Sequence, residues 1–190
     1  MGLDLTADSL SGTPKRVAKM YVQEIFKGLN PENHPVCRTF NNTYEYGEML
    51  VEKDINLNST CEHHFLPIAG RAHVAYKSSG QVIGLSKINR LVDFYAKRPQ
   101  VQERLTRQIA EALKAILDTE DVAVIIEAKH MCVSSRGIED EQSSTVTADY
   151  HGAFKENEAR REFLLLVSID INLYLEEDVS TIFLIRHICA

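Results

Sequence analysis

The chain has 190 residues, of which 44% are hydrophobic, and its formal net charge is −6. This is enough apolar material for one domain with its own core, and the acidic balance excludes a generally basic surface for nucleic acid. The four cysteines are too few for a disulfide scaffold, and residues 1–20 lack the apolar stretch of a secretory signal. No apolar run is as long as a membrane span. We therefore expect a cytoplasmic protein with free thiols and with neither a nucleic-acid nor a membrane partner.

The first part of the chain predicts one helix followed by less regular structure. Thr13 is a good N-cap, Pro14 suits the first helical position, and apolar residues recur at helical spacing as far as Gly28. Residues 30–36 contain two prolines and indicate a loop. Residues 44–57 indicate extended chain, although the pattern is weak.

The middle of the chain predicts a hairpin, two helices and a long strand. After residue 70, R-A-H-V-A-Y alternates, K-S-S-G turns and Q-V-I-G-L returns, which is a hairpin pattern. Ser86 can cap a helix that ends before Pro99, and a second helix is expected over about 100–117. The β-branched run at 121–133 predicts a strand. This order indicates an α+β fold with antiparallel pairing.

The stretch S-T-C-E-H-H-F carries the strongest chemical signal. Cys61 and His64 are three residues apart and offer a thiolate and an imidazole, which are ligands that suit zinc. In a regular strand over 121–133 the even positions share one face, so His130 and Cys132 would point the same way. A set of two cysteines and one histidine leaves the fourth tetrahedral position open, as in catalytic zinc sites. The remaining histidines, His63 and His130, would then be the natural proton carriers.

Simpler explanations exist for each of these residues. A C-x-x-H pair is common by chance, and Cys132 alone is more often a small buried apolar residue. His130 alone could be a core histidine with satisfied hydrogen bonds. A structural metal site completed by Cys37 or Cys189 is also open.

A basic cluster lies at the expected start of the first of the two middle helices. Ser86, Lys87 and Arg90 are grouped there, and helix N-termini favour anions. Arg136 follows the candidate ligand Cys132 in S-S-R-G. The cluster indicates either a polyphosphate cradle or an ordinary solvated helix start.

The second helix begins with Gln102-Glu103. Glu103 and Arg107 are four residues apart, so an exposed ion pair is the simple explanation for the carboxylate. The alternative is a carboxylate that reads the edge of a nucleobase. Composition does not choose between the two.

Several long motifs in order resemble the GTP cyclohydrolase I family of the bacterial, zinc-dependent type. They are S-T-C-E-H-H-F, G-L-S-K-I-N-R-L-V-D, R-P-Q-V-Q-E-R-L-T-R-Q-I and I-E-A-K-H-M-C-V, and the likeness covers about residues 3–167. The resemblance implies a hydrolase that opens the guanine imidazole ring of GTP, releases formate and forms 7,8-dihydroneopterin triphosphate. This is the entry step to tetrahydrofolate and other pterins, and hence to one-carbon metabolism.

The resemblance also implies a role for individual residues. The ligands of a catalytic Zn²⁺ ion would be Cys61, His64 and Cys132. The acid/base pair would be His63 and His130. The guanine ring would be held by Glu103, helped by Gln102. The triphosphate would be gripped by Ser86, Lys87, Arg90 and Arg136, with Lys19 reaching the triphosphate of a neighbouring subunit.

The implied architecture is the tunnelling fold, an antiparallel sheet with two helices packed on one side and closed into a barrel by oligomerisation. Members of the family form pentamer rings that associate into homodecamers, and the short N-terminal region here leaves the decamer open. We expect a catalytic domain over 1–167 and a C-terminal extension over 168–190 that is dispensable. The residues do not settle whether an allosteric effector or regulatory partner acts.

Two other functions remain compatible with the sequence. One is a non-catalytic zinc-binding oligomer on the same scaffold, which the loss of His63 or His130 would favour, although both are present. The other is a different tunnelling-fold enzyme that acts on a pterin or a deazapurine.

Overall fold

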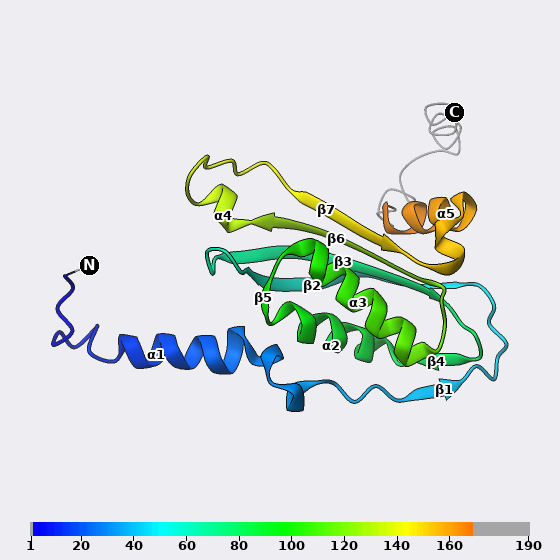
Figure 1. Ribbon diagram of the computed structural model, residues 1–190, viewed down its shortest axis with the longest axis horizontal. Coiled ribbons are helices and arrows are strands. Elements are labelled where there is room, and N and C mark those ends of the chain that lie inside the picture. The colour runs from blue at the N-terminus through cyan, green and yellow to red at the C-terminus, as the bar shows by residue number, and fades with distance from the viewer. Residues whose placement is uncertain (1, 169–190) are drawn as a thin grey trace, which may run out of the picture.

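The computed structural model describes residues 2–168 and shows a mixed α+β fold (Figure 1). The strands are β1 (Thr39–Asn41), β2 (Met49–Cys61), β3 (Pro67–Lys77), β4 (Gln81–Ile83), β5 (Pro99–Gln100), β6 (Val122–His130) and β7 (Thr145–Tyr150). The α-helices are α1 (Thr13–Met20), α2 (Leu85–Ala96), α3 (Gln102–Leu117), α4 (Met131–Ser134) and α5 (Asn157–Ser168). None of the helices within this part of the chain is long and apolar enough to cross a membrane. Apart from residue 168, the expected C-terminal extension lies outside the described residues.

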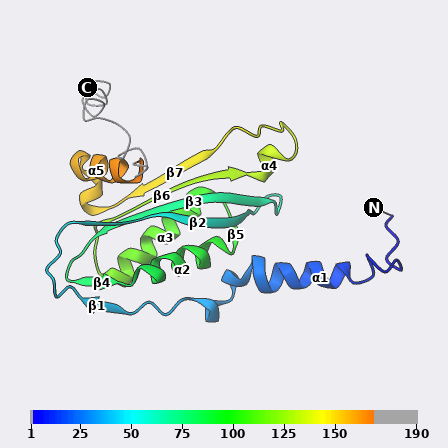
Figure 2. The same ribbon diagram turned by 180° about the vertical axis from the view of Figure 1, so that it is seen from behind.

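The main sheet has five strands in the order β5-β2-β3-β6-β7. Its neighbours are antiparallel, except that the two-residue β5 runs parallel to β2. A tight turn joins β2 to β3, whereas β3 and β6 are joined through α2 and α3. These two helices lie on one face of the sheet, in front of it in Figure 1 and behind it in Figure 2.

The core lies between that face and the two helices. Even-numbered residues of β6 point toward α2 and α3, as the alternation predicts, and Val122, Val124 and Ile126 are completely buried. From the helices the main contributors are Ile88, Leu91, Leu105, Ile109 and Leu113. The helix expected over 100–117 is confirmed in type and extent, because α3 carries its buried residues at helical spacing.

The opposite face of the sheet is covered at one end by α5. Phe154 and Phe163 are fully buried there, with their ring centroids 5.9 Å apart in an edge-to-face arrangement. They pack on Ala123 and Ile125, which are the odd-numbered residues of β6. Alternate side chains of one strand therefore enter two separate apolar clusters, and β6 is buried on both faces over this length.

The prediction of a hairpin after residue 70 is wrong, because β3 and β4 do not pair with each other. β3 is bonded on one side to β2 and on the other to β6, so neither of its edges is free for β4. β4 instead pairs with β1 in a separate two-stranded sheet, with Thr39 opposite Ile83. The three-residue β4 follows β3 closely in sequence but belongs to another sheet.

Two predicted helix starts are shifted. Gly84, rather than Ser86, occupies the N-cap of α2, and Ser86 lies within the first turn without a capping bond. Gly12 precedes α1 in the same way, so Thr13 and Pro14 are the first two helical residues. α1 buries none of its side chains and projects away from the body of the molecule (Figure 1).

The strand expected over 121–133 ends earlier than predicted. β6 stops at His130, and the next four residues form the single turn α4. Cys132 therefore lies on a helical turn, and the argument that placed it on one strand face with His130 is wrong. The chain bends where the apolar alternation stops, because residues after His130 are only partly buried and have no strand partner on β3.

Candidate functional site

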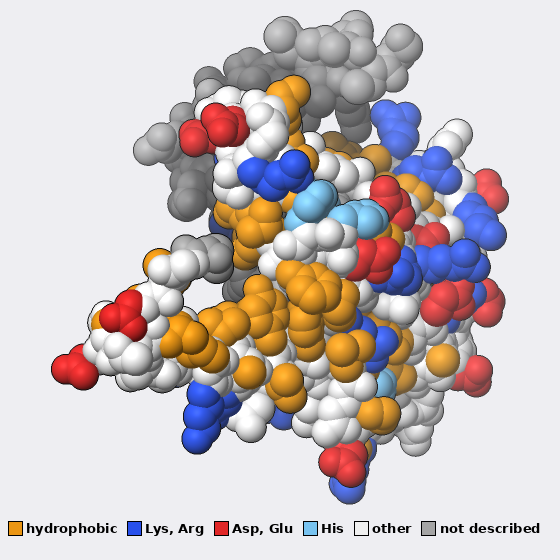
Figure 3. Space-filling view, turned by 60° about the vertical axis from the view of Figure 1, so that its left-hand side comes forward, with side chains coloured by type: hydrophobic (Ala, Val, Ile, Leu, Met, Phe, Trp, Pro, Cys, Tyr) orange, Lys and Arg blue, Asp and Glu red, His pale blue; other side chains and the backbone are white. Residues whose placement is uncertain are grey.

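Three segments that are far apart in sequence meet at one end of the sheet. They are the turn between β2 and β3, the start of α3, and the end of β6 with α4. The register places Cys61 opposite Gln100 and Ile68 opposite His130, which aligns the ends of these segments. At this end Figure 3 shows histidine side chains on the surface, bordered by acidic and basic groups and by an apolar patch.

Cys61, His64 and Cys132 form a group that could hold a metal ion. One ligand atom from each lies within 4.8 Å of the others, and the Cys61 Sγ is 4.0 Å from the His64 Nδ1. Zinc–ligand bonds of about 2.0–2.3 Å imply ligand separations of roughly 3.3–3.8 Å in a tetrahedral site, so a small inward movement would suffice. Within residues 2–168, Cys37 is not part of the group, and Cys189 lies outside the described residues.

The turn that carries two of these residues is held by backbone hydrogen bonds. The Cys61 N–H donates to the Leu66 carbonyl at 2.8 Å, and the Phe65 N–H donates to the Cys61 carbonyl at 2.8 Å. Phe65 adopts a left-handed backbone conformation with φ of 54°. These bonds close the turn tightly enough for residues 61 and 64 to face the same point.

The two thiols of the group affect each other. Burial, and then the neighbouring Cys61 thiol, raise the pKa of the Cys132 thiol. Two thiolates side by side repel each other, so a divalent cation between them would favour their ionised forms. The donor set therefore fits a soft divalent metal such as zinc.

His63 and Arg136 border the metal group on its exposed side. The His63 Nδ1 lies 3.6 Å from the Cys61 Sγ, and its ring is largely exposed. An Nη1 of Arg136 lies 3.0 Å from the His64 Nε2. Arg136, which the sequence analysis singled out, thus lies at the edge of the metal group.

His130 lies beside the first turn of α3. Its Nε2 is 2.8 Å from the Gln102 Oε1. Burial lowers the pKa of His130, and the negative charge of Glu103 opposes that shift. Glu103 is exposed, and within residues 2–168 no ion pair joins it to Arg107, so the simple explanation for this carboxylate is not observed.

Gln102 is buried rather than open to a ligand. Its side chain is 1% exposed, and its amide nitrogen lies 3.0 Å from the Ile126 carbonyl and 2.9 Å from the Thr145 carbonyl. The neighbouring residues of α3 therefore point in opposite ways, with Gln102 inward and Glu103 toward solvent.

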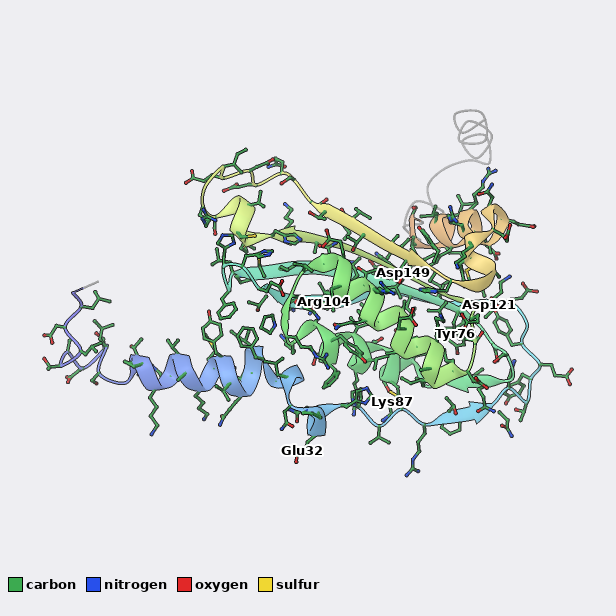
Figure 4. The ribbon with its side chains drawn as sticks, in the orientation of Figure 1. Glu32, Tyr76, Lys87, Arg104, Asp121 and Asp149 are labelled. Atoms are coloured by element: carbon green, nitrogen blue, oxygen red, sulfur yellow. The ribbon has the colours of Figure 1, made fainter. Side chains whose placement is uncertain are left out.

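An ion pair that the sequence did not predict anchors the turn. Arg104 pairs with Glu62, the residue between Cys61 and His63, and Figure 4 shows Arg104 near the start of α3. Arg104 also donates to the Gln100 Oε1 and to the Pro99 carbonyl, each at 2.9 Å. The only available signal was the position of Glu62 inside C-E-H-H, because its partner is 42 residues away.

The other predicted phosphate ligands are not brought to the metal group within the chain. Ser86, Lys87 and Arg90 lie in the first half of α2, and Figure 4 places Lys87 beside the segment that leads to β1, away from α4. Lys19 is exposed on the projecting α1. The predicted phosphate ligands therefore lie in three separate places on the chain.

An aromatic group connects the chain after α1 to the site. Tyr21 begins the π-helical segment Tyr21–Ile25 and Phe26 follows it, and both rings pack near Phe65, at centroid distances of 6.2 and 5.2 Å. The Tyr21 hydroxyl also donates to the Phe65 carbonyl at 3.4 Å. The segment thus rests on the residue that ends the metal-ligand turn.

Comparisons with known proteins agree on one family. The model of the family described as GTP cyclohydrolase I matches residues 1–168. The GTP cyclohydrolase 1 of Flavobacterium johnsoniae is 64% identical over 170 residues, which are 90% of this chain and 76% of the relative. The GTP cyclohydrolase 1 of Aeromonas salmonicida is 55% identical over 165 residues, which are 86% of this chain and 76% of the relative.

One solved structure resembles part of the chain. It is the archaeosine synthase QueF-Like in the apo form, with a TM-score of 0.46 and 18% identity over 55% of this chain and 93% of that chain. This likeness is too slight to support a conclusion.

Proposed function

Because the chain belongs to the GTP cyclohydrolase I family, we propose that it converts GTP and water to formate and 7,8-dihydroneopterin triphosphate. The observation that carries this proposal is the grouping of Cys61, His64 and Cys132, with the His63 ring 3.6 Å from the Cys61 thiol and His130 two residues before Cys132. Such a site suits hydrolysis at an electrophilic carbon of the purine ring. The product would supply tetrahydrofolate and other pterins, and we expect the enzyme in the cytoplasm.

The proposed cofactor is a Zn²⁺ ion held by Cys61, His64 and Cys132. Bound there, zinc would supply Lewis acidity for the attack of water on C8 of guanine. Glu62 and Arg104 would keep the ligand turn in place, since they tie it to α3.

The acid/base work is assigned to His63 and His130. His63 is exposed next to the metal group, where it can exchange protons with solvent and with the substrate. His130 is partly buried and held by Gln102, so it presents one fixed ring edge. Opening the imidazole ring requires a proton on the departing ring nitrogen, which a positioned imidazole can provide.

Glu103 is the proposed guanine reader. Its exposed carboxylate lies close enough to His130 to influence that residue's charge. A carboxylate accepts hydrogen bonds from the N1–H and the 2-amino group of guanine, and adenine does not present the same pair of donors.

The triphosphate site is proposed to be shared between subunits. Arg136 lies at the metal group, whereas Ser86, Lys87, Arg90 and Lys19 lie elsewhere in the same subunit. A neighbouring chain would bring its own copies of these residues to the site. This requires the homo-oligomer of the tunnelling fold, in which pentamer rings close the sheet into a barrel and pair into a decamer. The strand β7 supports such closure, because within the described residues it pairs only with β6.

The test is a GTP turnover assay on the full chain, with zinc measured on the same sample. We expect dihydroneopterin triphosphate by its absorbance, formate in equal amount, and about one zinc per chain. Cys132→Ala should lose both metal and turnover, whereas His63→Ala should keep the metal and lose turnover. Cys37→Ala is the matched control, because Cys37 lies outside the group and should keep both. Zinc retained by Cys132→Ala would overturn the ligand set, and a metal-loaded chain without product would overturn the activity.

A further inference from the structure

The side chain of Gln102 belongs to a closed and buried network. Its amide nitrogen lies 3.0 Å from the Ile126 carbonyl, 2.9 Å from the Thr145 carbonyl and 3.1 Å from the Thr147 hydroxyl. These acceptors belong to β6 and β7, the two strands beside the start of α3. Gln102 therefore joins three elements at the point where the proposed active site begins.

The orientation of the amide follows from its partners. The nitrogen and oxygen of a glutamine amide are usually hard to tell apart, and the hydrogen-bond network has to assign them. Two of the partners here are backbone carbonyls, which can only accept, so the NH₂ group must face β6 and β7. The Oε1 must then face His130.

The hydroxyls of Thr106 and Thr147 are consistent with the same orientation of the Gln102 amide. The Thr106 hydroxyl donates to the main-chain carbonyl of Gln102 at 2.8 Å, which uses its only proton. The 2.7 Å bond between the Thr106 and Thr147 hydroxyls must then use the Thr147 proton. Thr147 is left as an acceptor for the Gln102 amide, so the two amide protons are shared among three acceptors, all of them on β6 and β7.

We infer that Gln102 is a positioning residue that holds His130 in the tautomer with its proton on Nε2. A carbonyl oxygen can only accept, so the 2.8 Å contact to Gln102 requires an N–H at the Nε2 of His130. In the neutral ring the Nδ1 is then the free base, and it is the atom that exchanges a proton with the substrate. This deepens the proposed function and rests on it. It also argues against a guanine contact for Gln102, because the nitrogen and the oxygen of its buried amide already have protein partners.

The kinetic test compares Gln102→Leu, His130→Ala and the double variant. We expect Gln102→Leu to lower kcat about 100-fold, the lower range for loss of acid/base catalysis, with little change in KM for GTP. The double variant should be no slower than His130→Ala, because residues that act as one unit are not additive. A raised KM with unchanged kcat, and effects that add to those of His130→Ala, would overturn the inference in favour of a guanine contact.

A matched control separates this effect from a general loss of structure. Gln81 also uses its side-chain amide, donating to the Asn41 Oδ1 at 2.9 Å, but it lies on β4 in the other sheet. Gln81→Leu should keep wild-type kcat and KM. Zinc content and thermal melting of each variant show whether it is folded.

A spectroscopic test does not depend on turnover. In protein labelled with ¹⁵N-histidine, a solid-state spectrum of the neutral ring distinguishes the two tautomers, and the His130→Ala variant identifies the signal. A protonated Nε2 with an unprotonated Nδ1 is expected in the wild type. The opposite tautomer would overturn the inference even if the enzyme is active. An inactive wild type with the expected tautomer would instead refute the proposed function and leave only the orienting role of Gln102 toward His130 standing.

Discussion

Replacing Arg104 by glutamine should weaken zinc binding, although Arg104 touches none of the proposed ligands. The guanidinium pairs with Glu62 and donates to the Gln100 Oε1 and the Pro99 carbonyl, both at 2.9 Å. Glu62 is also held through its backbone, because its N–H donates to the Gln100 carbonyl at 3.0 Å. Glu62 directly follows the ligand Cys61, so loss of these contacts would loosen the turn that carries the metal ligands.

The expected magnitude follows from the exposure of the pair. The side chains of Arg104 and Glu62 are 43% and 34% exposed, so solvent screens the interaction. Three such contacts at about 0.5–1 kcal/mol each amount to about 1.5–3 kcal/mol. At about 1.4 kcal/mol per tenfold change, this corresponds to a roughly 10- to 100-fold rise in the Kd for zinc.

The assay is competition for zinc with a chromophoric chelator. Arg107→Gln is the control, because Arg107 is an exposed arginine on the same helix that has no ion pair with Glu62. The double variant of Glu62→Gln and Arg104→Gln should bind zinc about as well as Arg104→Gln alone, since the same contact is lost. Equal Kd values for Arg104→Gln and Arg107→Gln would refute the argument that this ion pair supports the metal site.

Three further predictions concern stability. Burial lowers the pKa of His73 below its ordinary value of 6.5, so the unfolded chain takes up a proton more readily than the folded chain. The free energy of unfolding, measured by urea titration, should therefore fall as the pH drops below about 6.5. This fall should be smaller in His73→Gln. Gly70→Ala should lower the melting temperature, because a Cβ there would overlap the Glu127 carbonyl of β6; an unchanged melt would contradict this packing. Phe163→Ala should cost about 3–5 kcal/mol in urea unfolding, since this ring on α5 is fully buried against the sheet, and a cost below about 1 kcal/mol would mean that α5 is not docked.

Part of the fold could be predicted because the signal was local. The apolar spacing within 102–117 and the alternation in 122–130 are each contained in one element, and both are confirmed. The pairing of β4 was not local. Its partner β1 lies about 40 residues earlier, and a three-residue strand has too few side chains to specify a partner by pattern.

The site was predictable to a similar extent. Cys61 and His64 could be paired from their spacing, and Cys132 from its rarity, although the strand argument that placed Cys132 beside His130 was wrong. The ion pair of Glu62 with Arg104 and the burial of Gln102 depend on how α3 packs against the sheet. No spacing within one element reports on such contacts, because their partners come from different elements.

The connection between β3 and β6 has a kinetic consequence. Both middle helices lie in that connection, so β6 can pair with β3 only after a long loop has closed, and contacts of high sequence separation form slowly. Cys61 ends the strand before β3, and Cys132 follows β6 directly, so the two thiols meet only when this pairing is complete. The time at which the refolding chain takes up a metal would therefore report when β6 pairs with β3. With cobalt in place of zinc, the thiolate–metal colour should develop with the slowest folding phase and be absent from any earlier intermediate.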